Sequence, residues 1–220
     1  MPITSKLGTV TLRSVNIPLN TSSGWTVTSA SGTGTGSINT TTQRARVVVT
    51  SGTLGWAENT RSISLDLPTI DGSAVEMTAR LATFTNADAN SRAQFVIQYP
   101  VTGVVFGLTI YGDGTFEKGY LSSASVYTAG STTNPAMFPT NGTGWAKLRV
   151  RGSLYEGFYG TGTTTTPPTQ WIETGSTNVS FATDGDLVPN EFTAGGGQIT
   201  AGPTGNLVIE WDNISIKHLS

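Results

Sequence analysis

The feature that most constrains this chain is a two-residue periodicity of apolar side chains, which recurs in short runs separated by clusters of Gly, Asn, Asp and Pro. Such alternation gives a β-strand one apolar and one polar face, and the separating residues are those that turns require. Apolar residues at helical spacing are almost absent. We therefore predict an all-β protein, an antiparallel β-sandwich or jelly roll. The clearest strand candidates are residues 9–15, 44–50, 61–67, 74–84, 92–99, 104–111, 145–151, 154–160 and 207–216.

The stretch "WAKLRVRGSLYEGFYG", residues 145–160, predicts a two-faced hairpin. A two-residue turn at Gly152-Ser153 would place Arg149 opposite Glu156 and Lys147 opposite Phe158, so that the charges have local partners. The alternative interpretation is a basic and aromatic ligand platform. The predicted core face holds Leu148, Val150, Tyr155 and Tyr159, and the other face holds Lys147, Arg149, Glu156 and Phe158.

Two strand candidates carry further information. Residues 74–84 alternate as in a half-buried strand, with Val75, Met77, Ala79, Leu81 and Thr83 on one face. In "LVIEWDNISIK" the apolar phase changes, because Leu207, Ile209 and Trp211 share one parity while Ile214 and Ile216 take the other. This change requires a bulge or bend, which we place at Asp212-Asn213. The strand is therefore expected to pass from one packing environment to another.

Three low-complexity segments, residues 28–42, 161–169 and 193–205, are rich in Thr, Gly and Pro. Their polarity and glycine content predict loops or sheet edges and not core strands. Such loops are where we expect ligand or subunit contacts.

Length and composition exclude several classes of protein. We expect residues 1–220 to form one domain, with residues 1–25 as an N-terminal arm or edge strand. The net charge of −2 and the absence of a Lys/Arg cluster argue against nucleic-acid binding. Cysteine is absent, which removes disulfides and zinc-thiolate sites. No apolar run suits a signal peptide or a membrane span, so we expect synthesis in a host cytoplasm and no membrane association.

From about residue 60 onward, the order of motifs resembles the concanavalin A-like lectin/glucanase β-sandwich, including laminin-G-type domains. The matching pieces are "AVEMTARL", "FVIQY", "GDGTFEKG", "GWAKLRVRG", "QWIETG" and a closing "IEWDNISI". The resemblance implies a concanavalin A-like sandwich, and jelly-roll carbohydrate modules share several of these pieces.

The sequence predicts no catalytic residue. Glucanases of this superfamily carry Glu-x-Asp-x-(x)-Glu on one strand, because retaining hydrolysis needs an acid and a nucleophile about 5 Å apart. The nearest match, Glu210-Trp211-Asp212, is followed by Asn, Ile and Ser and lacks the second glutamate. A carboxylate pair from separate strands is the alternative. His218, the single histidine, lies two residues from the end of the sequence, where it is poorly placed for a triad or a metal site.

We expect no metal and no cofactor. Asp113 (in "YGDGT") and Asp184 (in "TDGD") offer carboxylates to calcium, but neither has a spaced set of acidic neighbours. Both are therefore interpreted as turn residues, and calcium binding is the alternative.

Two functional hypotheses follow. The first is a non-enzymatic structural protein of a virus particle, such as a bacteriophage capsid decoration, head-fibre or tail component. It would be located in the virion as a homo-oligomer in contact with other virion proteins. Its support is a Thr/Gly/Ser-rich, charge-poor composition without cysteine.

The second hypothesis is a carbohydrate-binding, lectin-like module. Sugar sites use exposed aromatic faces together with amides and carboxylates. Of the five tryptophans, Trp211 is predicted to be in the core and Trp145 in the core or at an edge. Trp25, Trp56 and Trp171 lie beside Gly- or Thr-rich stretches, so they are the candidate ligand-binding residues, with burial as loop anchors as the alternative.

Overall fold

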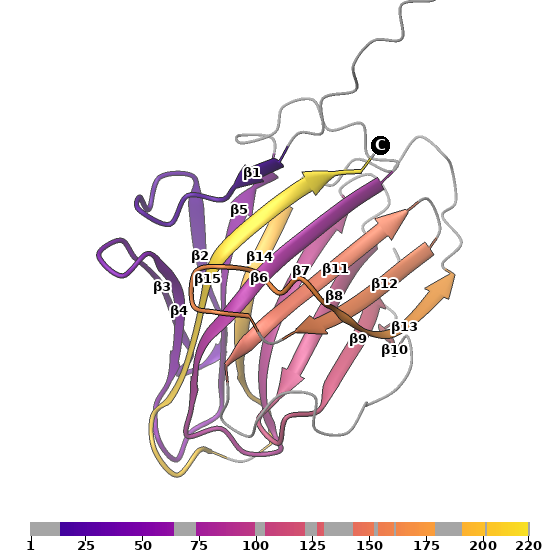
Figure 1. Cartoon of the computed structure of the whole chain (residues 1–220). Coiled ribbons are helices and arrows are strands. Elements are labelled where there is room, and N and C mark those ends of the chain that lie inside the picture. Colours follow the sequence, from indigo (N-terminus) through magenta and orange to yellow (C-terminus); the bar gives the residue numbers. More distant parts are fainter. Residues whose placement is uncertain are drawn as a thin grey trace, which may run out of the picture.

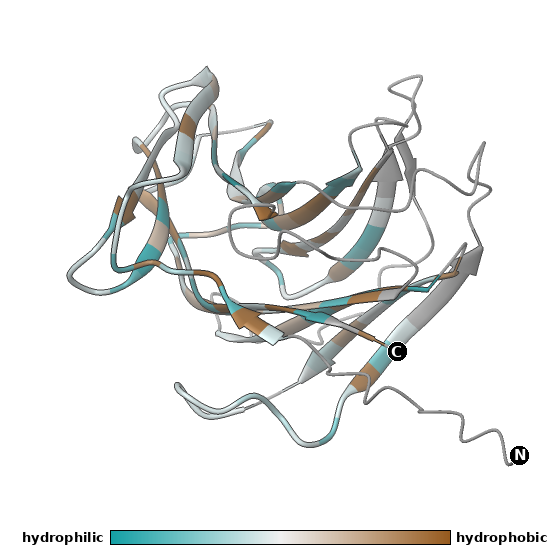
Figure 2. Cartoon of the chain, turned by 90° about the horizontal axis from the view of Figure 1, so that it is seen from above, coloured by the Kyte–Doolittle hydropathy of each residue, from teal (hydrophilic) through white to brown (hydrophobic). Residues whose placement is uncertain are grey.

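Two antiparallel sheets stack face to face in the computed structural model (Figure 1). It describes residues 14–63, 74–99, 104–121, 127–129, 143–151, 154–160, 162–178, 191–200 and 202–219. Over these residues sheet A has the order β13-β12-β11-β6-β15-β4-β3, with β1 paired to β15, and sheet B has the order β10-β9-β8-β7-β14-β5-β2. Figure 2 shows the two layers from above. The predicted all-β sandwich is confirmed.

The strands of sheet A are β1 (Ser14–Asn16), β3 (Thr35–Asn39), β4 (Arg44–Val49), β6 (Ala74–Thr85), β11 (Gly144–Arg151), β12 (Leu154–Gly160), β13 (Ile172–Asn178) and β15 (Leu207–His218). Those of sheet B are β2 (Trp25–Gly32), β5 (Gly55–Ser62), β7 (Ser91–Tyr99), β8 (Val104–Tyr111), β9 (Phe116–Leu121), β10 (Tyr127–Ala129) and β14 (Glu191–Gln198).

The core lies between the sheets, where the apolar side of each alternating strand meets the other layer. Trp211 is fully buried there, and its ring meets that of Phe95 edge to face at 5.5 Å between centroids. The prediction that Trp211 belongs to the core is confirmed. The opposite side of sheet A, called here the outer face of sheet A, carries the polar residues of the same strands.

The hairpin β11–β12 has the predicted register. Arg149 pairs with Glu156 and Lys147 with Phe158, and both pairs lie on the outer face of sheet A. The residues predicted for the other face, Leu148, Val150, Tyr155 and Tyr159, belong to the core. The turn residues themselves lie outside the described part of the chain.

The predicted irregularity in the last strand is also present. The pairing of β15 with β6 shifts between Asp212 and Ser215, and Asn213 adopts a left-handed conformation with φ 48°. Before the shift β15 pairs with β4, and after it with β1, so the strand does change its neighbour. The pairing of β15 with β6 shifts a second time, between Glu210 and Trp211. As a result Thr83, which we predicted on the same face as Val75 and Met77, faces outward, and Phe84 is buried in its place.

Two expectations about strands are wrong. Residues 193–198 lie in β14, which is hydrogen-bonded to β5 and β7 in the interior of sheet B, although we predicted a loop or edge for 193–205. Glycine is needed at position 196 because an added Cβ would lie 2.3 Å from the backbone carbonyl oxygen of Arg92 on the neighbouring strand β7 and 2.5 Å from Ile209 of the facing sheet. The strand predicted at 61–67 begins earlier than expected: β5 runs from Gly55 to Ser62, and residues 64–67 lie outside the described part of the chain. The segment 28–42 does form the edge strands β2 and β3.

Candidate ligand-binding groove

A groove of about 800 Å³ lies over the outer face of sheet A. Its floor comes from β6, β11 and β15, and its walls come from three separate segments: residues 16–20, residues 41–43 at the β3–β4 turn, and residues 164–167. This volume is within the usual range for ligand pockets, about 300–1,000 Å³. The lining residues are Asn16, Ile17, Pro18, Leu19, Asn20, Thr41, Thr42, Gln43, Arg80, Trp145, Thr164, Thr165, Pro167, Asp212, Asn213, Ile214 and Ser215.

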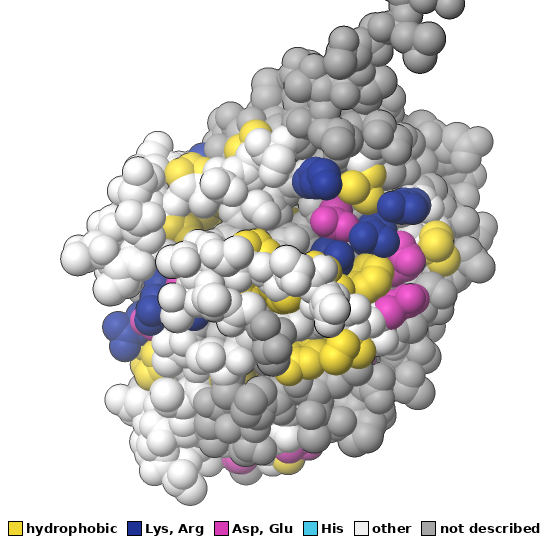
Figure 3. All heavy atoms as spheres, viewed as in Figure 1, with side chains coloured by type: hydrophobic (Ala, Val, Ile, Leu, Met, Phe, Trp, Pro, Cys, Tyr) yellow, Lys and Arg dark blue, Asp and Glu magenta, His cyan; other side chains and the backbone are white. Residues whose placement is uncertain are grey.

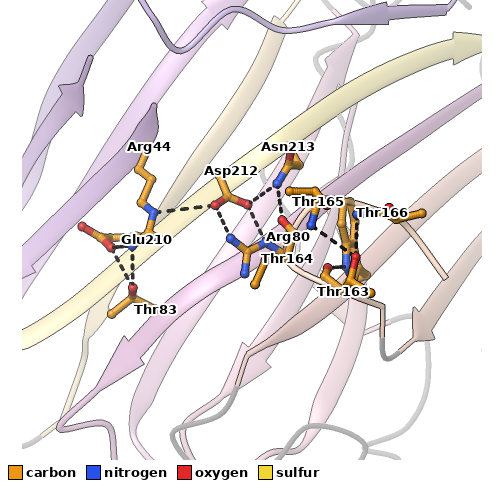
Figure 4. Close-up of polar contacts among 11 residues, drawn as sticks. Arg44, Arg80, Thr83, Thr163, Thr164, Thr165, Thr166, Glu210, Asp212 and Asn213 are labelled. Atoms are coloured by element: carbon orange, nitrogen blue, oxygen red, sulfur yellow. Dashed lines mark hydrogen bonds and ion pairs between the residues drawn. The ribbon is translucent and has the colours of Figure 1, made fainter. Parts of the chain in front are cut away.

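The charges in the floor are paired with one another (Figure 4). Arg80 donates two hydrogen bonds to Asp212, one from Nε at 2.8 Å to Oδ1 and one from Nη2 to Oδ2. Both side chains are about nine-tenths buried. Arg44 lies 3.6 Å from the same carboxylate. The floor therefore offers an ion pair with little net charge.

Glu210 belongs to the same array, beside the groove. Its Oε2 accepts hydrogen bonds from Arg44 Nη1 at 2.5 Å and from Thr83 Oγ1 at 2.7 Å, and Arg46 lies 3.6 Å from Oε1. Burial raises the pKa of Glu210, but these hydrogen bonds and the arginine charges outweigh burial and hold the pKa below 4.5. Glu210 is therefore ionised at neutral pH.

The bulge in β15 gives the groove its shape. Because Asn213 takes the left-handed conformation, its side chain leaves the sheet and bridges to the wall. Its amide donates to the carbonyl oxygen of Thr164 at 2.9 Å and to Asp212 Oδ1 at 2.9 Å. The irregularity predicted from the sequence thus positions a contact between the floor and one wall.

Residues 162–171 form a segment, called here the strap, that passes over the outer face of sheet A between β12 and β13 (Figure 1). Trp145 lies beneath it with 1% of its surface exposed and donates from Nε1 to the carbonyl of Thr163 at 2.9 Å. Trp145 is therefore buried, but on the face opposite the core. This position differs from the predicted core or edge placement.

At its far end the strap packs on a charged cluster. Lys147 Nζ lies 4.4 Å from the centre of the Trp171 ring and 4.5 Å from that of Phe158. It is 3.7 Å from Glu76, which also accepts a hydrogen bond from Arg149 at 2.8 Å. Burial lowers the pKa of Lys147, partly offset by the negative charge of Glu76. Figure 3 shows basic and acidic side chains intermixed on this face.

The three candidate tryptophans do not come together. Trp25 begins the edge strand β2, donates from Nε1 to the carbonyl of Pro18 at 3.0 Å and packs on Phe192. Trp56 points away from the core on β5 of sheet B, where Nε1 donates to Glu58 at 2.9 Å. Trp171 alone of the three lies on the outer face of sheet A, and none of the three lines the groove.

Sequence reasoning missed most of the groove residues. The walls at 16–20 and 41–43 have no motif, and only the low complexity of segments 28–42 and 161–169 marked part of the lining in advance. The floor pair Arg80–Asp212 joins residues on different strands, so no local pattern reveals it.

The described residues contain no cluster of acidic or histidine side chains that could hold a metal ion. Asp113 acts in a turn: its Oδ1 accepts hydrogen bonds from the backbone N and the hydroxyl of Thr115 at 2.9 and 2.7 Å. Asp184 lies outside the described residues. In the part of the chain that is described, no helix has the length and apolar character needed to cross a membrane.

No protein-family model and no curated protein sequence matches this chain. Among solved structures, a β-1,3-1,4-glucanase (lichenase) derived from a mouse hindgut metagenome has a TM-score of 0.61 at 11% identity, over 93% of this chain and 98% of that one. The CBM2 module of the evolved Dit of Lactobacillus casei BL23 phage J-1 has a TM-score of 0.52 at 13% identity, over 94% and 96%.

The exoplasmic/lumenal domain of VIP36, in its Ca²⁺/Man3GlcNAc-bound form, has a TM-score of 0.52 at 13% identity, over 95% of this chain and 90% of that one. At such identities the likeness establishes the fold alone. The chain has the concanavalin A-like lectin/glucanase β-sandwich fold, which lectins, glucanases and phage modules share.

Proposed function

We propose that this protein binds a neutral glycan in the groove on the outer face of sheet A and does not cleave it. The observation that carries the proposal is the chemistry of the lining. Neutral hydroxyl and amide side chains surround a floor whose charges are already paired.

Neutral polar groups suit sugar hydroxyls, which both donate and accept hydrogen bonds. Asn20 and Thr42 are exposed on two different walls, and Pro18 and Pro167 add apolar surface. An acidic sugar would need a cation that is not already engaged. Among the described residues, Arg80 is the only arginine in the lining, and it holds Asp212 through two hydrogen bonds, which favours an uncharged ligand.

The absence of catalysis is also part of the proposal. A glycosidase needs a carboxylic acid with a raised pKa and a second carboxylate placed across the scissile bond. The pKa of Glu210 is lowered, so Glu210 is not suited to donate a proton at neutral pH, and Asp212 is engaged by two hydrogen bonds from Arg80.

The test is calorimetric titration of the full chain with neutral oligosaccharides, beginning with β-1,3-1,4-glucan fragments and Man3GlcNAc, which the structural neighbours suggest. Asn20→Ala and Thr42→Ala should each weaken binding about fivefold, the value of one hydrogen bond of about 1 kcal/mol. The matched control is Thr28→Ala, an exposed threonine on edge strand β2, which should change nothing.

Equal loss of affinity in Thr28→Ala and Thr42→Ala would place the site elsewhere. Absence of binding to a broad panel of neutral glycans would refute the proposal. Release of products at a rate that Glu210→Gln abolishes would refute the non-catalytic part.

We further propose that the protein is a component of a phage particle, where the groove would contact host-surface glycan. The support is the likeness to the CBM2 module of the phage J-1 Dit over nearly the whole of both chains, together with a composition poor in charge and rich in Thr, Ser and Gly. Light scattering on the purified chain, with calcium and with chelator, should give a closed oligomer. A monomer in both conditions would count against this role.

A further inference from the structure

The strap is much longer than its connection requires. Tyr159 of β12 pairs directly with Ile172 of β13, and antiparallel neighbours in such a register can be joined by a two-residue turn. The chain instead leaves β12 and reaches β15, where Thr164 accepts the hydrogen bond from Asn213. In the strand order of sheet A this path crosses over β11 and β6.

The strap is also fixed along its length. The indole of Trp145 donates a hydrogen bond to the carbonyl oxygen of Thr163 and so anchors the strap to β11. Within the strap, the hydroxyl of Thr163 accepts hydrogen bonds from the backbone N atoms of Thr165 and Thr166 at 3.4 and 3.0 Å. At its end Trp171 packs on Lys147. Contacts with Trp145, Asn213 and Lys147 hold the strap in place as one wall of the groove, and Figure 4 shows the contact with Asn213.

The position of this wall limits the ligand. Thr164, Thr165 and Pro167 close the groove on the side of β11, while residues 16–20 and 41–43 stand on the side of β4. A polysaccharide lying across sheet A would have to pass through backbone that is hydrogen-bonded to Asn213 and Trp145. The outward-pointing residues that would continue a binding surface beyond the strap, Lys147 and Phe158, are each less than a tenth exposed.

We infer that the strap makes the groove specific for the end of a neutral glycan chain, or for a short oligosaccharide, and excludes internal segments of a polysaccharide. This inference rests on the proposed function, because it specifies the ligand of the same groove. It adds that the strap, through its position across β11 and β6, determines which part of a glycan can enter.

The test measures how many protein molecules bind each glycan chain. The full chain is titrated by calorimetry and by sedimentation with β-1,3-1,4-glucan fragments of increasing length and with the polymer, and with the mannose oligosaccharide series if glucan does not bind. The expected number stays at one as the glycan lengthens, and affinity stops rising after the first few sugar units.

A variant in which residues 162–170 are replaced by Asn-Gly should bind several molecules per polymer chain, because the wall is gone. Removal of the strap exposes Trp145 and can thereby impair folding. A second variant therefore combines Asn213→Ala with Trp171→Ala, which removes two contacts that anchor the strap.

Several full-length molecules bound along one polymer chain would overturn the inference and leave glycan binding intact. Absence of any glycan binding would overturn the proposed function and the inference together. The wild-type stoichiometry decides between these outcomes even if both variants fail to fold.

Discussion

Lys118 is a buried cation in the core, and removing its charge should stabilise the protein. The residue lies on β9 with no exposed surface, and its Nζ has no hydrogen-bond partner among the described residues. The Tyr155 ring lies 5.7 Å from Nζ. Gly157 lies on the facing strand, where an added Cβ would be in ordinary van der Waals contact with Lys118, at 3.6 Å from its Cβ.

Burial lowers the pKa of Lys118 from 10.5 to about 8, with the charges of Glu173 and Glu156 acting in the opposite direction. The unfolded chain therefore binds more protons than the folded one between pH 8 and 10.5, so the free energy of unfolding rises with pH through this window. Below pH 8 the full cost of charging the buried amine is present. A shift of this size corresponds to roughly 3 kcal/mol.

The assay is urea unfolding of the wild-type chain and of Lys118→Met at pH 7 and pH 10.5. Methionine has a similar length and no charge, so we expect it to raise the unfolding free energy by about 3 kcal/mol at pH 7. At pH 10.5 most of this difference should disappear, because the wild-type amine is then neutral. Lys217→Met, at a partly exposed lysine on β15, is the control and should change stability by less than about 1 kcal/mol.

The reasoning would be refuted if Lys118→Met destabilised the protein at pH 7. A stabilisation of equal size at both pH values would also refute it, since the gain would then come from packing and not from the charge.

Three further perturbations follow from the structure, and urea unfolding measures each. Arg80→Leu should lower the free energy of unfolding by about 3 kcal/mol, because it removes the arginine that pairs with the buried carboxylate of Asp212. The double variant Arg80→Leu with Asp212→Leu should lose less stability than the single variant. Gly196→Ala should lower the free energy of unfolding by at least about 2 kcal/mol, because φ is 153° and the new methyl would lie 2.3 Å from the backbone carbonyl oxygen of Arg92; an unchanged midpoint would contradict this. Glu210→Gln should lower the free energy of unfolding by about 2 kcal/mol at pH 7. Because the pKa of Glu210 is lowered in the folded protein, its ionised form stabilises the fold at pH values above the ordinary carboxyl pKa, and this contribution is lost as pH falls. The stabilities of wild type and variant should therefore converge in acid.

The alternation of side chains was enough to predict the sandwich, because a period of two exposes opposite faces whatever the distant parts of the chain do. The hairpin β11–β12 illustrates this: its register and both faces follow from nearby residues. The bend at Asp212 and Asn213 was predictable for the same reason, since a change of phase within one strand has a local cause.

Local patterns were insufficient where a distant neighbour overrides propensity. The glycines of β14 predict a loop, yet the segment is an interior strand because it pairs with β5 and β7, and at Gly196 the backbone of β7 leaves no room for a side chain. The sequence predicts Trp145 as a core or edge residue, yet Trp145 lies on the outer face of sheet A, where the strap covers it. The path of the strap cannot be predicted from the alternation of side chains, because the strap is not a strand.

The features of the candidate site likewise fall into those that nearby residues predict and those that depend on distant parts of the chain. Local sequence was sufficient to predict the two-sheet architecture, the pairing of Arg149 with Glu156 on one face, and the bulge that turns Asn213 out of the sheet. The pairing of Arg80 with Asp212, and the groove that three separated segments enclose above them, became apparent from the folded chain alone. The reason is physical: strand faces and bulges arise from interactions between near neighbours, whereas a groove depends on which strands become adjacent and where the connecting segments cross them.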